Sequence, residues 1–435
     1  MKFFADLHIH SKFSRATSKQ MDLEVLDRWA QIKGIQVLAT GDWTHPQWFN
    51  DLRTKLVPAE PGLFCLKKSH SKIMVKKNPA LANLPQITSV GQTRFILSTE
   101  ISCIYNRNDK TRKIHLLILA PDLDTVDKIN TYLGWIGNLK SDGRPILGLD
   151  AQEAAKIVFN VNPECMIIPA HIWTPWFSLF GSRSGFDDIR ECFGPYTKNI
   201  HALETGISSD PAMNWRWSRL DKYALVSNSD SHSPAKIGRE ANQFDCELSY
   251  QGIANALKNK ASKQFLQTIE FFPEEGRYHY DGHRLCKVSF SPQQTKQANG
   301  LCSKCGKPVV VGTMSQIDGL ADRLLGEKPK YAVSYQNLIP LQEIVGAALG
   351  LGVGAKAVWR EYKELINYFG DEFKILLTAS DDQLVSASRP EIAEAIRRVR
   401  LGQVQIAPGY DGEYGKISIF GNGEQNNFSK QKSLI

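Results

Sequence analysis

The sequence predicts an α/β protein whose strands are mainly parallel and whose reactive side chains lie at strand ends. An apolar strand at 2–10 is followed by an amphipathic helix at 22–33 and a second apolar strand at 35–40. This order of elements is typical of a parallel sheet. Two further apolar segments, at 166–170 and 224–228, are also followed by His, Ser or Asp. Catalytic residues of closed parallel barrels lie at these C-terminal strand ends, so we expect an active site there.

Length and composition limit the class of protein. The chain has 435 residues, 42% of them apolar, which is enough for two or three domains. It contains no apolar stretch long enough to cross a membrane, and its first residues predict a strand rather than a signal peptide. We therefore expect a cytoplasmic, monomeric protein that does not act at a membrane. The net charge of +8 favours an acidic partner.

The first strand ends in two histidines, His8 and His10. Side chains alternate along a strand, so both imidazoles point to the same side. Paired imidazoles at a strand end can bind a metal ion. The pair alone does not decide between a metal site and an ordinary buried polar pair, so the interpretation depends on ligands further along the chain.

The next elements bring more candidate ligands. The helix at 22–33 is followed by Gly34, a residue typical of a helix C-cap, and the strand at 35–40 is followed by Asp42 and His45. Strands at 95–105 and 113–120 form a predicted hairpin that carries Glu100 and His115. A carboxylate inside a strand is costly unless it is paired or bound to a metal, whereas a lone histidine there is more often a core residue.

Three later strands extend the pattern. The strand at 166–170 is followed by His171, the strand at 201–206 carries Glu204, and Asp230 and His232 follow the strand at 224–228. The full set of candidate metal ligands is His8, His10, Asp42, His45, Glu100, His115, His171, Asp230 and His232. Mixed imidazole and carboxylate ligands suit zinc, manganese or iron rather than calcium. Their number predicts two or three ions, an arrangement typical of phosphoester hydrolysis.

A separate group of ligands predicts one structural zinc ion. Cys302 and Cys305 are spaced by two residues, as are His283 and Cys286 upstream. Four such ligands close a tetrahedral site, which leaves no position for catalysis. His279 is the alternative fourth ligand.

Candidate contacts to nucleic acid lie in two regions. The segment at 50–85 is basic and resembles an insertion, and a loop after His171 combines aromatic residues with arginine. Solvated surface and local core are the simpler interpretations, and phosphate binding and base stacking are the functional ones. The candidates are Lys67, Lys68, Lys72, Lys76, Lys77, Trp173, Trp176, Arg183 and Arg239.

Several of these segments together resemble the PHP (polymerase and histidinol phosphatase) superfamily. They are Asp6-Leu7-His8-Ile9-His10, the strand end at Asp42, Glu100, His115, His171 and Asp230-Ser231-His232. The resemblance implies a distorted (β/α)7-type barrel and a metal-bridged hydroxide as nucleophile. It implies that the metals are zinc, manganese, magnesium or iron. By motif matching, the first metal is held by four catalytic residues, His8, His10, Glu100 and Asp230. Glu100 bridges to a second metal on His115 and His171, and His232 binds a third. His45 would replace the histidine that usually follows Asp42.

The segments at 210–215, 229–240 and 278–286 resemble the endonuclease Q family within that superfamily. This resemblance implies a DNA repair endonuclease that flips out a deaminated base (uracil, hypoxanthine or xanthine) or an abasic site. It would hydrolyse the phosphodiester on the 5′ side of the lesion. The alternatives are a phosphomonoesterase acting on a small metabolite and a non-catalytic DNA-binding protein. A sliding clamp could be a partner, but the sequence has no clear clamp-binding motif.

We therefore expect four regions. Residues 1–270 form the catalytic domain with the basic insertion near 50–85, and 271–330 form the zinc-binding module. Residues 331–420 form a mainly helical domain, and 421–435 a disordered tail. The predicted C-terminal helices are 342–349, 355–368 and 389–400.

Overall fold

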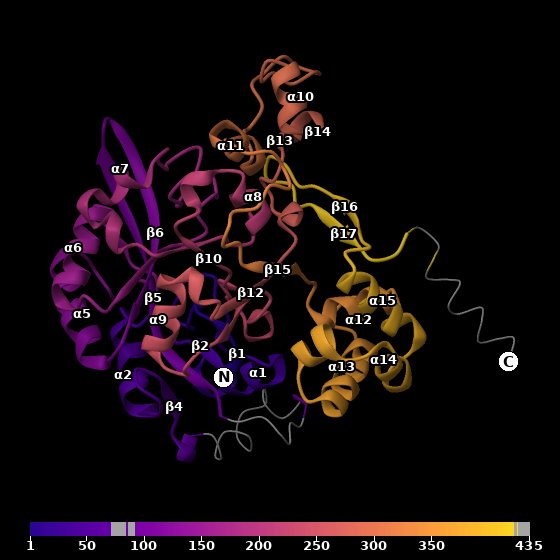
Figure 1. The fold of residues 1–435 in the computed structure, drawn as a ribbon, viewed down its shortest axis with the longest axis horizontal. Helices are drawn as coiled ribbons and strands as arrows, with labels where there is room; N and C mark the ends of the chain where they lie inside the picture. The colour runs from indigo at the N-terminus through magenta and orange to yellow at the C-terminus, as the bar shows by residue number, and fades with distance from the viewer. Residues whose placement is uncertain (71–83, 86–91, 422–423, 425–435) are drawn as a thin grey trace, which may run out of the picture.

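The computed structural model describes residues 1–70, 84–85, 92–421 and 424 (Figure 1). Its barrel is built outward from β1 (Lys2–Asp6). Strand β1 pairs in parallel with β2 (Val37–Ala39), and β2 pairs in parallel with β5 (Arg94–Arg107). Helix α1 (Leu23–Lys33) connects the first two strands. It begins at Asp22, whose side chain accepts a hydrogen bond from the Val25 amide, and ends at Gly34 in a left-handed conformation. The predicted strand–helix–strand order is therefore confirmed.

The ring continues through antiparallel strands. Strand β6 (Lys110–Ala120) runs back along β5, and β8 (Met166–Pro169) pairs antiparallel with β6. Strands β9 (Ala202–Glu204) and β10 (Ala224–Val226) are parallel to each other. The Ile172 amide donates to the Glu204 carbonyl after β8, and the His10 amide donates to the Ser231 carbonyl after β1. Among the described strands, β1, β2, β5, β6, β8, β9 and β10 thus form a distorted ring. The α/β prediction is confirmed, but the strand directions are mixed.

Further strands widen the sheet beside β1. Strand β11 (Ala241–Asp245) pairs antiparallel with β1, β12 (Phe265–Glu270) pairs antiparallel with β11, and β15 (Ser334–Asn337) pairs in parallel with β12. Helices lie outside the strands in Figure 1. Their bounds are α5 (Leu123–Ile136), α6 (Ala151–Val161), α7 (Ile189–Phe193), α8 (Pro211–Trp215) and α9 (Tyr250–Lys258).

The first part of the predicted insertion belongs to the fold. Helix α2 (Pro46–Lys55) begins with proline at its first turn and buries Trp48, Phe49 and Leu52. The short strands β3 (Leu56–Pro58) and β4 (Phe64–Leu66) pair antiparallel and join the sheet at β5. Lys72, Lys76 and Lys77 lie outside the described residues.

The zinc-binding module has little apolar core of its own. It contains β13 (Asp281–His283), β14 (Val288–Phe290), α10 (Pro292–Gln297) and α11 (Thr313–Leu320). A separate buried cluster consists of Val288, Cys302 and Val309 only, among the residues described. So small a core does not stabilise a domain without a metal or disulfides.

The helical region packs firmly on the barrel. Lys33 of α1 forms a buried 2.8 Å ion pair with Glu372, and the rings of Phe4 and Phe373 lie 4.4 Å apart. The helices are α12 (Leu341–Leu349), α13 (Lys356–Phe369), α14 (Asp381–Ala387) and α15 (Pro390–Arg400), with a π-helical turn at Lys374–Thr378. Three of these helices were predicted, and α14 was not.

The chain then returns to the zinc-binding module. Strands β16 (Gln405–Ala407) and β17 (Lys416–Ser418) form a hairpin, and the Gly409 amide within it donates to the Glu274 carbonyl. Figure 1 shows this hairpin between the helical region and the module. The predicted tail at 421–435 lies largely outside the described residues. In the part of the chain that the structure covers, no helix is long and apolar enough to cross a membrane.

Candidate metal centre

Four predicted ligands converge beside the C-terminal end of β1. The ligand atoms of His8, His10, Glu100 and Asp230 all lie within 4.8 Å of one another. His10 Nε2 lies 3.0 Å from Asp230 Oδ1 and 3.2 Å from Glu100 Oε2. His8 Nε2 lies 3.5 Å from the same glutamate oxygen. This group has the residue types and spacing of a site for a divalent transition metal.

A second group adjoins the first and shares Glu100. Its members are Glu100, His115 and His171, again within 4.8 Å. Glu100 Oε1 lies 2.7 Å from His115 Nδ1 and 3.2 Å from His171 Nε2, whereas Oε2 faces His8 and His10. The two oxygens of one carboxylate therefore face two ligand groups, which is the geometry of a bridging ligand.

Two observations within the chain fit bound cations. Of the described buried side chains, His8 Nε2, His10 Nε2 and Asp230 Oδ1 are among those without a hydrogen-bond partner. Leaving buried polar atoms unsatisfied is costly unless an ion binds them. In addition, His171 and Asp230 have positive φ angles of 32° and 45°. Such strain in non-glycine residues is typical of functional sites.

Buried carboxylates behind the imidazoles fix their orientation. Glu204 Oε1 lies 2.9 Å from His8 Nδ1, and Asp42 Oδ1 lies 2.9 Å from His10 Nδ1. A carboxylate only accepts hydrogen bonds, so each Nδ1 donates and each Nε2 keeps a free lone pair for a metal. The sequence placed Glu204 on its strand but gave it no role. The signal available in the sequence was a carboxylate within a predicted strand, directly after Ala202 and Leu203.

The centre shifts the pKa of its ligands in both directions: burial would lower the pKa of His8 and His10, but the surrounding carboxylates raise it well above the usual range. Burial would raise the pKa of Glu100, but His115 and Arg144 hold that pKa well below its usual range. Burial would also raise the pKa of Asp230, but the adjacent imidazoles of His10 and His8 hold that pKa well below its usual range. Burial lowers the pKa of His115 to about 4, although Glu100 opposes the shift. The carboxylates are therefore ionised and His115 is neutral at neutral pH.

Arg144 is a site residue that the sequence analysis missed. It lies in the segment between α5 and β7 (Ile146–Leu147), and its Nη1 is 3.0 Å from Glu100 Oε2. Its guanidinium is only partly buried. No local pattern marks an arginine in a loop as part of a distant metal centre, so only the folded chain reveals it.

Three predicted ligands are not in either group. Asp42 uses its second oxygen to accept hydrogen bonds from Ser11 and Ser14, so it supports His10 instead of facing a metal. His45 stacks on Phe13 with a ring distance of 4.3 Å. The ring of His232 lies 4.5 Å from that of His10 at a tilt of 47°, and His232 Nδ1 lies 2.8 Å from the Asp230 carbonyl. Sequence position alone could not show which way these side chains turn.

The predicted zinc ligands do come together. His283, Cys286, Cys302 and Cys305 lie within 4.8 Å of one another. Desolvation opposes ionisation of Cys302, but amide hydrogen bonds from residues 304 and 305 outweigh it and lower the pKa of the thiol to about 6. The thiolate is the form that binds metal. His279 is buried elsewhere and is not in the group, so His283 is the fourth member.

A cavity of about 770 Å³ opens beside the metal centre. Asp230 and His232 line it, together with Trp176 and Tyr278, whose rings meet edge to face at 5.8 Å. Trp176 is 40% exposed. Arg239 also lines the cavity, and its guanidinium donates to the Ser229 carbonyl. The cavity therefore combines aromatic faces, cationic groups and the edge of the metal centre.

The other predicted DNA contacts differ in their surroundings. Trp173 is 1% exposed and donates to Asn214, so it is a core residue and the prediction that it contacts DNA is wrong. Lys67 donates to the Thr54 carbonyl. Lys68 and Arg183 are exposed.

The fold and the two adjoining ligand groups define an α/β protein with a candidate metal centre. The chain is, more particularly, a structural homologue of endonuclease Q. It matches the crystal structure of the lesion-specific endonuclease PfuEndoQ from Pyrococcus furiosus with a TM-score of 0.81 and 29% identity, over 96% of this chain and 95% of that one. It matches endonuclease Q in complex with a 27-mer duplex bearing an abasic lesion with a TM-score of 0.80 and 29% identity, over 97% of each chain.

Sequence comparisons give relatives whose names assign no function. The uncharacterized protein YqxK of Bacillus subtilis is 27% identical over 96% of this chain and 99% of its own length. The uncharacterized protein MJ0043 of Methanocaldococcus jannaschii is 35% identical over 57% of this chain. The match spans only 31% of the length of that relative. A family model described as the MJ0043 C-terminal domain matches residues 340–403, which contain α12 to α15.

Proposed function

We propose that this protein is a metal-dependent DNA endonuclease that cuts beside damaged nucleotides. The observation that carries the proposal is the shared carboxylate, Glu100, at the junction of two metal-ligand groups that open into a cavity. Its support from relatives is the similarity, over nearly the whole chain, to a lesion-specific endonuclease and to an endonuclease bound to an abasic-site duplex.

The residues of the centre have distinct roles in this proposal. His8, His10, Glu100 and Asp230 would hold one divalent ion, and Glu100, His115 and His171 a second. Such ions polarise the scissile phosphodiester and lower the pKa of a water molecule so that it can attack. Glu204 and Asp42 keep the two imidazoles oriented, and Arg144, which is partly exposed beside Glu100, is positioned to pair with a phosphate oxygen.

The cavity beside the centre would receive the lesion nucleotide. Its volume of about 770 Å³ is within the range of about 300–1,000 Å³ typical of small-ligand sites. Trp176 and Tyr278 offer faces for stacking on an extruded base. Deaminated bases (uracil, hypoxanthine or xanthine) and abasic sites are cheaper to extrude than paired bases, so the enzyme would select them. The resemblance to the endonuclease Q family implies that the cut falls on their 5′ side. The proposed module zinc on His283, Cys286, Cys302 and Cys305 would be structural.

The test is a cleavage assay on duplexes that each contain one uracil, hypoxanthine, xanthine or abasic site, with manganese, magnesium or zinc. An undamaged duplex and the Asp230→Asn variant are the controls. We expect a single nick 5′ of the lesion by the unsubstituted chain only. Release of phosphate from a phosphomonoester, with all duplexes intact, would instead identify a small-molecule phosphatase.

A further inference from the structure

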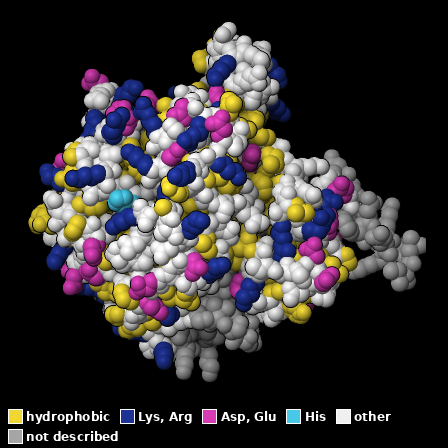
Figure 2. All heavy atoms as spheres, in the orientation of Figure 1, with side chains coloured by type: hydrophobic (Ala, Val, Ile, Leu, Met, Phe, Trp, Pro, Cys, Tyr) yellow, Lys and Arg dark blue, Asp and Glu magenta, His cyan; other side chains and the backbone are white. Residues whose placement is uncertain are grey.

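Two glutamates lie buried beside each other in the sheet, and neither belongs to a metal-ligand group. Glu240 directly precedes β11, and Glu270 is the last residue of β12. They are 1% and 0% exposed, whereas the acidic side chains on the face shown in Figure 2 lie among Lys and Arg at the surface. Because a buried carboxylate is costly unless a cation or a proton neutralises it, something must balance the charge of this glutamate pair.

The strand register places the two carboxyl groups opposite each other. Strands β11 and β12 run antiparallel, with Ala241 opposite Ile269. Continued by one residue, this register sets Glu240 opposite Glu270, and the Cβ atoms of such a pair are about 4.5–5.5 Å apart. Glu240 Oε1 accepts a hydrogen bond from the Phe271 amide at 3.3 Å, so its carboxyl group is held against β12.

The hydrogen bonds of the two carboxyl groups differ. Glu270 accepts from the hydroxyl groups of Thr205, at 3.1 Å, and Thr268. Glu240 Oε2, in contrast, is one of the described buried atoms without a hydrogen-bond partner. A protonated carboxyl oxygen is a donor, and an ionised carboxylate only accepts. A proton on Glu240 Oε2, donated to an ionised Glu270, would satisfy the oxygen that is otherwise without a partner.

The surroundings of the pair favour such a proton. The charged and titratable side chains that face the pair from neighbouring segments are mostly acidic or neutral. They are Glu204 of β9, Asp210 of α8, Tyr335 of β15 and Arg239. Arg239 is the one cation in this set, and its guanidinium donates to the Ser229 carbonyl. Burial and the adjacent carboxylate raise the pKa of Glu240 well above its usual range, and burial raises the pKa of Glu270 to about 8.

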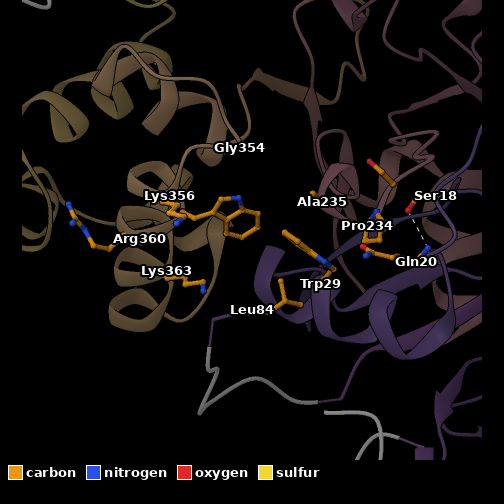
Figure 3. Close-up of a pocket in the computed structure, with 12 residues that line it drawn as sticks. Ser18, Gln20, Trp29, Leu84, Pro234, Ala235, Gly354, Lys356, Arg360 and Lys363 are labelled. Carbon is orange, nitrogen blue, oxygen red and sulfur yellow. Dashed lines mark hydrogen bonds between the residues drawn. The ribbon is translucent and has the colours of Figure 1, made fainter. Parts of the chain in front are cut away.

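The glutamate pair lies directly behind the wall of a cavity. Residues 233–239 border two cavities, and Figure 3 shows Pro234 and Ala235 on the barrel side of the first, which has a volume of about 960 Å³. Arg239 and Phe271 line the second, the cavity of about 770 Å³ beside the metal centre. Arg239 precedes one glutamate of the pair in the chain, and Phe271 follows the other. A change in the spacing of the pair therefore moves this wall.

We propose that Glu240 and Glu270 share one proton at neutral pH and that this proton holds the wall of the cavity beside the metal centre in place. The role of the cavity in this proposal rests on the proposed endonuclease function. The shared proton makes a hydrogen bond between the ends of β11 and β12. Its loss leaves two buried negative charges opposite each other, whose repulsion pushes the strands apart. Glu240 is thus a positioning residue, which acts through Arg239 and Phe271.

The first test measures the free energy of unfolding in urea between about pH 5 and pH 8. The unsubstituted chain is compared with Glu240→Gln, and Glu247→Gln, which changes an exposed residue after β11, is the control. In the unfolded chain Glu240 ionises near its ordinary pKa of 4.5, so the folded chain carries one more proton over this range. The folding equilibrium constant of the unsubstituted chain should therefore fall about tenfold per pH unit relative to Glu240→Gln.

The control should run parallel to the unsubstituted chain. Glu270→Gln, which offers a donor from the other strand, is the second variant and should behave as Glu240→Gln does. Curves of stability against pH that are parallel for the unsubstituted chain and both pair variants would refute the shared proton.

The second test measures DNA affinity against pH, which a purely structural role would not change. A duplex with one abasic site is titrated at neutral and alkaline pH in an Asp230→Asn background that prevents cleavage. Above about pH 8, binding requires the uptake of one proton, so affinity should fall about tenfold per pH unit. Adding Glu240→Gln should remove this loss, whereas Glu240→Ala, which has no donor, should weaken binding at every pH.

The two tests separate this proposal from the proposed function. Equal pH profiles of affinity with and without Glu240→Gln would refute the positioning role, while nicking of lesion duplexes by the unsubstituted chain would keep the proposed function. A chain with the expected dependence of stability on pH that neither binds nor nicks any lesion duplex would keep the shared proton and refute the proposed function.

Discussion

Glu204 provides a sensitive test of how the metal centre is organised. Its carboxylate accepts hydrogen bonds from His8 Nδ1, from Asn228 Nδ2 at 2.9 Å and from the His171 amide at 2.9 Å. It therefore orients one ligand of each group. The Glu204→Gln variant keeps the shape of the side chain but has only one accepting oxygen.

The size of the effect follows from this count of donors. Three N–H groups point at Glu204, and a glutamine oxygen has two lone pairs, so at least one buried donor loses its partner. Leaving one unsatisfied costs about 1–3 kcal/mol. Changes to residues that only orient metal ligands typically reduce metal affinity or activity by about 10–100-fold. We expect a loss in that range for manganese affinity.

The assay is a manganese titration of metal-depleted protein, paired with single-turnover cleavage at saturating manganese. The matched control is Glu270→Gln, because Glu270 is equally buried but bonds to Thr205 and Thr268 and contacts no histidine of the centre. We expect the control to bind manganese normally. Equal manganese affinity in Glu204→Gln and the unsubstituted chain would show that Glu204 does not organise the centre.

Three further outcomes test other parts of the structure. Trp173→Ala should cost about 3–5 kcal/mol of folding free energy in urea denaturation because the ring is buried. Trp176→Ala should leave stability unchanged and weaken binding of lesion DNA about 5–100-fold. The reverse pattern would exchange their roles. Burial lowers the pKa of His279 to about 4 from 6.5, so the unfolded state takes up this proton first as the pH falls. By pH 5 the free energy of unfolding should therefore fall by about 2 kcal/mol relative to that of His279→Phe. Parallel curves of stability against pH for the two proteins would contradict this. Cys302→Ser should release one zinc ion per chain and raise hydrogen exchange over residues 281–309 without unfolding the barrel. Unchanged zinc content and unchanged exchange would show that no structural zinc is held there.

The strand ends could be predicted from the sequence because their signals are local. Apolar runs that end in His or Asp marked His8, His10, His171 and Asp230, and the Cys spacing marked the zinc-binding module. The structure brings these residues into three compact groups. The alternation of side chains along a strand and the parallel order of the first elements were enough for this part of the account.

Features that depend on long-range contacts could not be predicted. Asp42 was expected to face a metal, but its orientation depends on Ser11 and Ser14, which a sequence pattern does not place around it. Arg144 reaches Glu100 from a loop 44 residues further along the chain. Similarly, the hairpin of β16 and β17 leaves the helical region and packs beside residues near 274–280.

The most direct test of the central claim is the Glu100→Gln variant, because Glu100 faces both ligand groups. Metal content and cleavage of a duplex with one abasic site are measured on the same samples, with manganese added. The unsubstituted chain should bind at least two ions and cut once, 5′ of the lesion. The variant should lose bound metal and cleave more than about 100-fold more slowly, beyond the usual effect of residues that only orient ligands. Normal metal content and cleavage in Glu100→Gln would contradict the account of a bridged metal centre.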